Sequence, residues 1–406
     1  MDQAIMGMPP RRIAGNLGAR ETARRAAAMS QPPPEHPFRF FDNRGKYLLF
    51  VTTTSEKQAI AARIGQELTL LEPRPPALRL FDAGMGDGTV LMRVLRHLHR
   101  LYPTVPFLVV GKEISLEDVR MSLEKLPDRF HEHPQMVAVV TNMYYFEATG
   151  LRPKSSAAAA LLNWHEIALE GDSAHAFDAQ IQGLQSLLAE GWQTRPSPKT
   201  GNPTYVRPSV LVLYRKDQEY VLDRIVPHPG EAEGAYDLVV ASQPYRARLP
   251  VATKVSYVLE PMVRCLAPGG RMIAIQSTGR DPGMEIIRSV WPEADPFRSP
   301  RQALIAALEA RMKETLPDLH YAAGDDAQAE FRYHLHILPE ELSSTIGSST
   351  LLAAWNAAVY VAQIDDDRLV EALGGGAYLQ ATEAVLKQHG GLWFLDESFV
   401  VARAPA

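Results

Sequence analysis

The pattern of apolar and polar residues divides much of the chain into short apolar runs that alternate with amphipathic stretches. Three early apolar runs end at the polar residues Asp82, Glu113 and Asn142. Apolar residues at helical spacing follow the first of these runs. Strands that alternate with helices are typical of a parallel sheet covered by helices on both faces. The pattern therefore predicts an α/β fold.

The first of these strands runs directly into a glycine-rich loop. Asp82 is followed by Gly84, Gly86 and Gly88, and the helix 90–95 begins immediately afterwards. Glycines at alternate positions let the backbone turn sharply and let a ligand approach without meeting a Cβ atom. The loop therefore predicts a nucleotide-cofactor site at the N-terminus of that helix, with an ordinary tight turn as the alternative.

The charge and spacing of the loop indicate which cofactor it would bind. A dinucleotide places a pyrophosphate at the helix N-terminus and spaces the glycines as G-x-G-x-x-G. Asp82 would repel a pyrophosphate, whereas it can accept hydrogen bonds from the ammonium group of S-adenosylmethionine. With Asp82 followed by glycines at positions 84, 86 and 88, the chain resembles the class I S-adenosylmethionine-dependent methyltransferases.

Later motifs extend this resemblance to about residues 82–145 and 235–278. An acid that ends the second strand usually binds the ribose hydroxyls, which makes Glu113 the ribose candidate. Asn142 ends the third strand, where the family places its adenine contact, although an Asp is commoner there. The run LAPGG at 266–270 resembles the family's turn into its fifth strand.

The resemblance implies a Rossmann-like seven-stranded methyltransferase sheet with helices on both faces. Two strands near the C-terminus would form the final pair of this sheet, in which the strand direction is reversed. An inserted lid and extra C-terminal helices would add to the minimal fold.

Turns and composition divide the chain into five segments. We expect residues 1–37 to be a flexible leader rich in Arg and Pro, and 38–79 to be a β-hairpin and a helix that covers the cofactor. The first half of the cofactor domain is expected at 80–150, an insertion at 151–234, and the second half with C-terminal helices at 235–406. A strand at 158–164, a helix at 174–190 and a hairpin at 210–222 are expected within the insertion. Because long structured insertions are usually functional, we expect a substrate lid, with surface decoration or a dimer contact as the alternative.

The loop after the strand 236–241 carries candidates for handling the methyl acceptor. It reads Ser242-Gln243-Pro244-Tyr245, where amino-directed methyltransferases carry Asn-Pro-Pro-Tyr or a close variant. The resemblance implies that Ser242, also a cofactor-site candidate, and Gln243 bind the acceptor, and that Tyr245 orients it. Gln243 departs from the proline of that pattern, so both nitrogen and oxygen acceptors stay open.

The strand that ends at the polar residues His165 and Glu166 makes it uncertain from the sequence which strand is the fourth of the sheet. The strand ending there could be the fourth strand, but the Pro-Gly-Gly turn follows the strand at 236 at the expected interval, which favours the latter. In either order His165 would lie near the ligand crevice. Its ordinary pKa suits a reserve general base, with a structural histidine as the alternative.

Composition and charge limit the classes of partner and the cell compartment that fit the chain. The net charge of −5 argues against a protein that mainly binds nucleic acid, and no apolar run approaches the roughly 20 residues that span a bilayer. The single Cys265 cannot form an intramolecular disulfide, which fits a reducing cytoplasm. The histidine pairs at 131 and 133 and at 334 and 336 lack further ligands at a recognisable spacing, so no metal is expected.

Together these observations predict a cytoplasmic S-adenosylmethionine-dependent methyltransferase. Its acceptor would be a small molecule or a peptide-derived group, methylated at nitrogen or oxygen. A homodimer is compatible with the apolar faces of the C-terminal helices. The alternative is a catalytically silent protein that binds S-adenosylmethionine as a partner or scaffold, because fold does not determine function.

Overall fold

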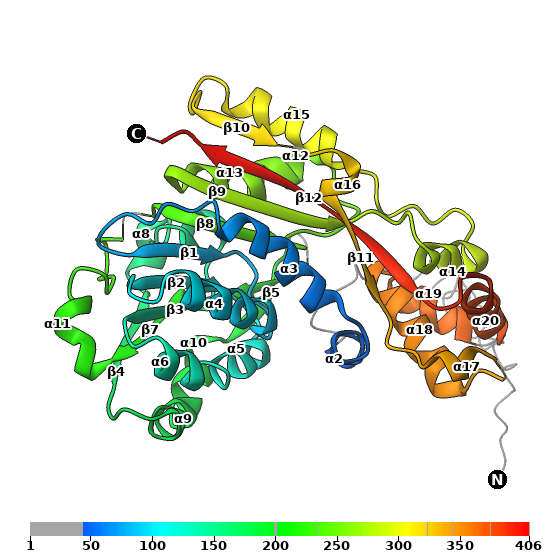
Figure 1. Cartoon of the computed structure of the whole chain (residues 1–406), viewed down its shortest axis with the longest axis horizontal. Coiled ribbons are helices and arrows are strands. Elements are labelled where there is room, and N and C mark those ends of the chain that lie inside the picture. Colours follow the sequence, from blue (N-terminus) through cyan, green and yellow to red (C-terminus); the bar gives the residue numbers. More distant parts are fainter. Residues whose placement is uncertain are drawn as a thin grey trace, which may run out of the picture. The chain divides into compact units, whose positions relative to one another are not determined.

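A ten-stranded mixed sheet forms the centre of the computed structural model, which describes residues 44–405 apart from 199–200, 233, 323, 344 and 374 (Figure 1). The strands lie in the order β10-β12-β9-β8-β1-β2-β3-β7-β4, and β11 pairs with β12. Their bounds are β1 Leu78–Asp82, β2 Phe107–Lys112, β3 Met136–Thr141, β4 Asn163–Leu169, β7 Ser209–Arg215, β8 Tyr236–Ser242, β9 Leu266–Ser277, β10 Leu319–Ala322, β11 Glu330–His334 and β12 Trp393–Arg403. The leader 1–37 and the expected strand at 38–41 lie outside the described residues.

Five parallel strands, in the order β3-β2-β1-β8-β9, make up the part of the sheet that the sequence predicts. β12 runs antiparallel to β9, and both β10 and β11 run antiparallel to β12, so this end of the sheet is reversed as expected, although β10 was not predicted. The Rossmann-like α/β prediction is confirmed, and the fourth strand is β8 at 236 rather than the strand at 163. The predicted number of seven strands is too low, because β7 and β4 extend one edge and β11 pairs with β12 beyond β10.

Much of the insertion extends the sheet, and Asn202 and Pro203 of its connector line a cavity, so the substrate lid stays a prediction. β7 pairs antiparallel with β3, and β4 pairs parallel with β7. Every residue of β7 is buried, as its continuous apolar sequence requires when both faces are covered. The expected strand at 158–164 is instead α8, Ser156–Ala159, followed by β4. The expected second arm of the hairpin is the short helix α11, Glu219–Leu222, which leaves Tyr220 exposed.

Two helices and a small ribbon complete the insertion. The expected helix at 174–190 is interrupted near Gly183, giving α9, Ala174–Gln182, and α10, Gln185–Gly191. The connector that follows forms a two-stranded ribbon of β5, Thr194–Pro196, and β6, Pro203–Tyr205.

Alternating residues of the strands point into two separate apolar cores. Leu80 packs with α3 and α4 on one face, whereas the next residue, Phe81, packs with α13 and α15 on the other. The bounds of these and the other connecting helices are α3 Glu56–Leu68, α4 Thr89–Leu101, α5 Leu116–Leu123, α6 Pro127–Glu132, α7 Tyr145–Ala148, α12 Val251–Lys254, η3 Val255–Leu259, α13 Glu260–Arg264 and α15 Arg301–Met312. The sheet is therefore covered on both faces, as predicted.

A third core joins the C-terminal helices to the N-terminal helix α2, Arg44–Thr53. Figure 1 shows α18 and α20 gathered beside the beginning of β12. These helices are α14 Pro282–Val290, α16 Asp326–Ala329, α17 Pro339–Ser343, α18 Ser348–Val361, α19 Asp366–Leu373 and α20 Ala377–His389. None of the helices in the described residues is both long and apolar enough to cross a membrane.

The helix α2 corrects the prediction of a β-hairpin at 38–51. The apolar run at 47–51 was expected to be its second strand, but Tyr47 and Phe50 lie one helical turn apart and both contact Tyr360 of α18. The ring centroids of Phe50 and Tyr360 are 4.7 Å apart. Packing against α18 thus overrides the local preference of the run for a strand.

Candidate functional site

The parallel part of the sheet contains a topological switch point between β1 and β8. From β1 the chain proceeds through β2 and β3 on one side, and later continues through β8 and β9 on the other. Ligands of open α/β sheets bind outside the carboxyl ends of the strands at such a point. A cavity of about 350 Å³, here called the switch-point cavity, lies there and is lined by Asp82, Glu113 and Ser242 among others.

Asp82 ends β1 at this cavity and is almost completely buried, with 3% of its surface exposed. Its Oδ1 atom accepts a hydrogen bond from the N–H of Gly84 at 3.2 Å. Burial raises the pKa of Asp82 to about 7, because a carboxylate without water or a full partner cation is costly. Its charge would be stabilised by a cationic ligand group in the cavity.

Glu113 follows β2 and fixes the glycine loop. One carboxylate oxygen accepts from the N–H groups of Ile114 and Ser115, and the other accepts from the N–H of Gly86 at 3.1 Å. A carboxylate can accept about four hydrogen bonds, so Glu113 retains capacity for a ligand hydroxyl.

The three glycines of the loop have different roles. Gly84 and Gly86 line the switch-point cavity, and a Cβ atom on Gly84 would meet nothing within 4 Å. Gly88 does not line it. Gly88 has a φ of +77°, and a Cβ atom there would lie 2.7 Å from the Oγ of Ser122. Gly88 packs against α5, and its expected contact with the cofactor stays a prediction.

The N-terminus of α4 is occupied by a carboxylate of the chain itself. Asp87 accepts a hydrogen bond from the N–H of Thr89 at 3.2 Å and forms an ion pair with Lys125 at 2.9 Å. Although burial opposes it, these partners lower the pKa of Asp87, so it is ionised at neutral pH. An anionic ligand group is thus disfavoured at this helix end.

A charged pair on α3 lines the same cavity and was not predicted as part of the site. Glu56 is 5% exposed, and its Oε2 atom lies 3.3 Å from the Nζ of Lys57 without accepting a hydrogen bond. Burial opposes the charge of Lys57, but Glu56 more than compensates, so that its pKa is raised. Ser55, just before the pair, does not cap α3, and its Oγ accepts a hydrogen bond from the N–H of His334.

Two predicted site residues lie elsewhere. Asn142 is buried, donates hydrogen bonds to the carbonyls of Gly191 and Arg207, and accepts one from the N–H of Ser209. It joins β3 to the insertion and does not line the switch-point cavity, and the expected adenine contact stays a prediction. His165 lies on β4 at the far edge of the sheet and does not line the cavity either, so its position does not suit the expected base.

The loop after β8 separates the switch-point cavity from a second one. Ser242, Gln243 and Tyr245 all line the first cavity. Gln243 has a φ of +48°, and its amide donates to the Oγ of Ser277 at 3.0 Å and to the buried Asp396 at 3.1 Å. The hydroxyl of Tyr245 donates to Gln276 at 3.0 Å, and burial raises its pKa.

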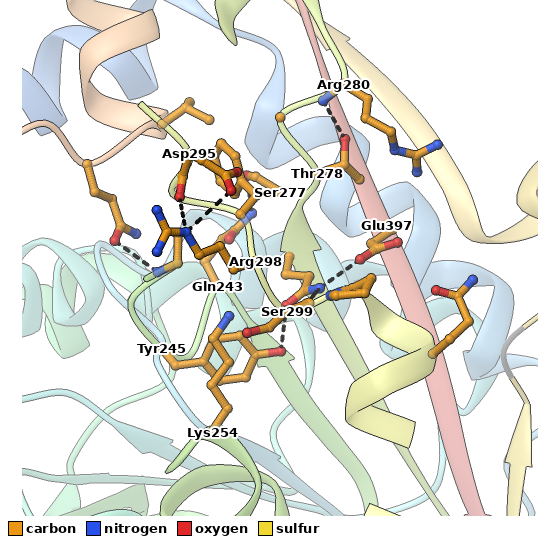
Figure 2. Close-up of a pocket in the computed structure, with 18 of the residues that line it drawn as sticks. Gln243, Tyr245, Lys254, Ser277, Thr278, Arg280, Asp295, Arg298, Ser299 and Glu397 are labelled. Carbon is orange, nitrogen blue, oxygen red and sulfur yellow. Dashed lines mark hydrogen bonds and ion pairs between the residues drawn. The ribbon is translucent and has the colours of Figure 1, made fainter. Parts of the chain in front are cut away.

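The second cavity has a volume of about 480 Å³ and is here called the basic pocket (Figure 2). It shares Gln243, Tyr245, Ser277, Val361 and Gln363 with the switch-point cavity. The two cavities therefore meet at the loop that the sequence predicts to hold the acceptor. Within the described parts of the chain, no group of three or more His, Cys, Asp or Glu residues could hold a metal ion.

No protein-family model and no curated protein sequence matches the chain. Among solved structures, it is similar to loganic acid methyltransferase with SAH, at 12% identity and a TM-score of 0.34, over 92% of this chain and 98% of that one. Geranyl diphosphate methyltransferase in complex with GPP and sinefungin gives 11% identity and a TM-score of 0.31, over 84% and 76% of the two chains. At such low identities and TM-scores, these likenesses carry no weight in assigning a function.

Proposed function

We propose that this protein is an S-adenosylmethionine-dependent methyltransferase whose acceptor is a small molecule or a peptide-derived group methylated at nitrogen or oxygen. The observation that carries the proposal is the set of buried charges at the switch-point cavity. Asp82 lines the cavity and accepts one hydrogen bond, from the N–H of Gly84, whereas Glu56, which also lines it, already has Lys57 at 3.3 Å. A buried carboxylate that lacks a partner cation, such as Asp82, favours a cationic ligand.

The residues present fit the amino-acid tail and the ribose of the cofactor. Asp82 and Glu56 would hold its ammonium group, and Lys57 would hold its carboxylate. Glu113 would accept hydrogen bonds from the ribose hydroxyls, since it stands at the end of β2 and keeps acceptor capacity. Tyr47 and Phe50 of α2 also line the cavity, which supports the expectation that the N-terminal segment covers the cofactor.

A dinucleotide fits less well, because its pyrophosphate would have to lie at the N-terminus of α4. Asp87 already bonds the first turn of that helix, and its negative charge is held there by Lys125. A second anion would meet this charge at close range. The negative charge of Asp87 at this helix end therefore favours a cofactor that is positively charged near the glycine loop.

The chain's own part in methyl transfer is mainly to hold the two reactants in line. When bound, S-adenosylmethionine supplies an electrophilic methyl group. Gln243 and Tyr245 lie where the switch-point cavity and the basic pocket meet, so they can position an acceptor atom toward the cofactor. The amide of Gln243 is already bonded to Asp396, which fixes the loop. The ring of Tyr245 then forms a wall for the acceptor.

Calorimetric titration with S-adenosylmethionine, S-adenosylhomocysteine and NAD tests the proposal. We expect the first two to bind in the micromolar range and NAD not to bind. Incubation with labelled methyl donor and fractionated cell extract should then transfer label to an acceptor. Binding of the donor without transfer to any fraction would favour the silent scaffold, and binding of NAD alone would contradict the proposal.

A further inference from the structure

The basic pocket is lined by more positive than negative side chains. Of the described residues around it, the basic ones are Lys254, Arg280, Arg288 and Arg298, and the acidic ones are Asp295 and Glu397. Asp295 forms an ion pair with Arg298 at 3.3 Å, and Glu397 accepts hydrogen bonds from Gln276 and from the N–H of Arg301. Arg280 pairs in turn with Glu330, and Arg301 lies 3.8 Å from Glu397, so the excess positive charge of the pocket comes from Lys254 and Arg288.

Lys254 is the unusual member of this set. It ends α12 and is 2% exposed, yet within the described part of the chain its Nζ has no hydrogen-bond or ion-pair partner. The Nζ lies 4.6 Å from the centre of the Tyr245 ring, and Figure 2 shows the two side chains against each other in the pocket. The side chain as a whole is buried, but its Nζ is not among the fully enclosed polar atoms without a partner, so it faces the pocket, where a bound anion would pair with it.

The backbone that follows Lys254 is also unusual. A π-helical turn, η3, begins directly after Lys254, and such turns occur frequently at functional sites because they redirect side chains. Burial lowers the pKa of Lys254 to about 8, and Glu397 opposes this shift. The ammonium form is thus destabilised in the free protein, and a bound anion would stabilise it.

From these observations we propose that the basic pocket binds the acceptor as a small organic anion, with its carboxylate or phosphate group held by Lys254. This inference rests on the proposed function for the identity of the ligand as a methyl acceptor, although the anion site itself does not depend on it. The pocket shares Gln243 and Tyr245 with the switch-point cavity. An anion anchored at Lys254 would therefore present the rest of the molecule toward the cofactor.

Chemical labelling of Lys254 tests the anion site directly. The protein is treated near pH 8 with an amine-reactive acylating reagent, and the labelling rate of each lysine is followed by peptide mass spectrometry at matched ionic strength. Inorganic phosphate, acetate and benzoate are the probes, and benzamide is the neutral counterpart of benzoate. We expect at least one of the anions to slow the labelling of Lys254 several-fold, with no effect of benzamide.

The exposed Lys387 on α20 is the internal control, and its labelling should not change. Protection by benzoate or acetate without phosphate would identify a carboxylate site, and protection by phosphate alone a phosphate site. Lack of protection by all three anions, equal protection by benzamide, or failure of Lys254 to react in the free protein would overturn the proposal.

A variant separates this inference from the proposed function. Lys254 does not line the switch-point cavity, so Lys254→Met should leave the affinity for S-adenosylmethionine unchanged. For the acceptor found in the extract, Lys254→Met should raise KM at least about tenfold, whereas Lys254→Arg should retain part of the affinity. The control Lys216→Met, at an exposed lysine of η2, Lys216–Gln218, should change neither.

The outcomes are distinguishable. Failure of the donor to bind the wild-type protein would refute the proposed function and leave the labelling result to decide the anion site. A neutral acceptor, or an unchanged KM in Lys254→Met, would refute the anion site and leave the methyltransferase proposal intact.

Discussion

Replacement of Asp82 by asparagine should weaken cofactor binding and at the same time stabilise the cofactor-free protein. Asp82 is buried at the end of β1, and burial raises its pKa to about 7. Asparagine keeps the shape of the side chain and an oxygen that can accept from the N–H of Gly84, but it carries no charge. The two effects have opposite signs because the same charge is favourable with a cation and unfavourable without one.

The binding effect should follow the ionised fraction of Asp82. With a pKa of about 7, roughly half of the carboxyl is ionised at pH 7 and about one tenth at pH 6. If an ammonium group binds the ionised form, the apparent Kd for S-adenosylmethionine should rise about tenfold between pH 8 and pH 6. The charged groups that act on Asp82 are Glu113, which raises its pKa, and Lys57, which lowers it.

The stability effect follows from the same pKa. A folded-state pKa of about 7, raised from 3.8, means that the folded chain binds more protons than the unfolded chain between these pH values. The free energy of unfolding therefore falls as the pH rises through this window. The cost at pH 8 is on the order of 4 kcal/mol. Asp82→Asn should remove it, raising Tm at pH 8 and changing it little near pH 4.

Calorimetry with S-adenosylmethionine and thermal unfolding followed by circular dichroism measure the two effects. Asp118→Asn is the matched control, because burial raises the pKa of Asp118 to about 7 as well, but Asp118 does not line the switch-point cavity. It should raise Tm and leave the affinity and its pH dependence unchanged. Equal affinities of Asp82→Asn and the wild type at pH 8 would refute the role given to Asp82.

Substitutions at three further positions test single structural features. Gly88→Ala should lower the free energy of unfolding by about 2 kcal/mol, because of the positive φ and the contact with Ser122, and denaturant titration measures this. Asn142→Ala should destabilise by about 2–3 kcal/mol through lost buried hydrogen bonds; a loss of donor affinity in calorimetry would contradict its structural role. Tyr245→Phe should retain most turnover in the labelled-methyl assay, since the ring remains, and Tyr245→Ala should not; equal turnover of Tyr245→Ala and the wild type would remove Tyr245 from the mechanism.

The sequence predicts best those parts of the fold whose structure is determined by residues within one short segment. The apolar run before Asp82, the acid after β2 and the strand at 236 are each specified within about ten residues. Each lies where predicted. A buried parallel strand must be apolar on both faces, and the polar residue that follows it lies at the carboxyl end of the sheet.

The prediction fails where distant segments decide the outcome. Residues 47–51 have the composition of a strand, but contacts of Tyr47 and Phe50 with Tyr360 make them helical. Asn142 follows β3 as predicted, yet Gly191 and Ser209 in the insertion take up its hydrogen bonds. Nothing within either segment indicates these partners.

The basic pocket was missed for the same reason. Lys254 belongs to an unremarkable helical stretch, and its importance depends on Tyr245, on Glu397 of β12 and on the loop before α15. The pairing of β12 with β9 places Glu397 opposite Gln276 and so beside the rest of the pocket. The periodicity of apolar residues indicates which face of a helix is buried. It does not indicate which charged side chains will pack against that face.

The conformation of Gln243 links the two cavities. A non-glycine residue with a positive φ costs on the order of 1 kcal/mol or more, and such strain persists only where other contacts hold it. Here the side chain is held by Ser277 and by the buried Asp396 of β12. Gln243 lines both cavities, and methyl transfer requires donor and acceptor to meet in line at one point. The strain is therefore concentrated at the boundary where the proposed reaction would need a fixed backbone.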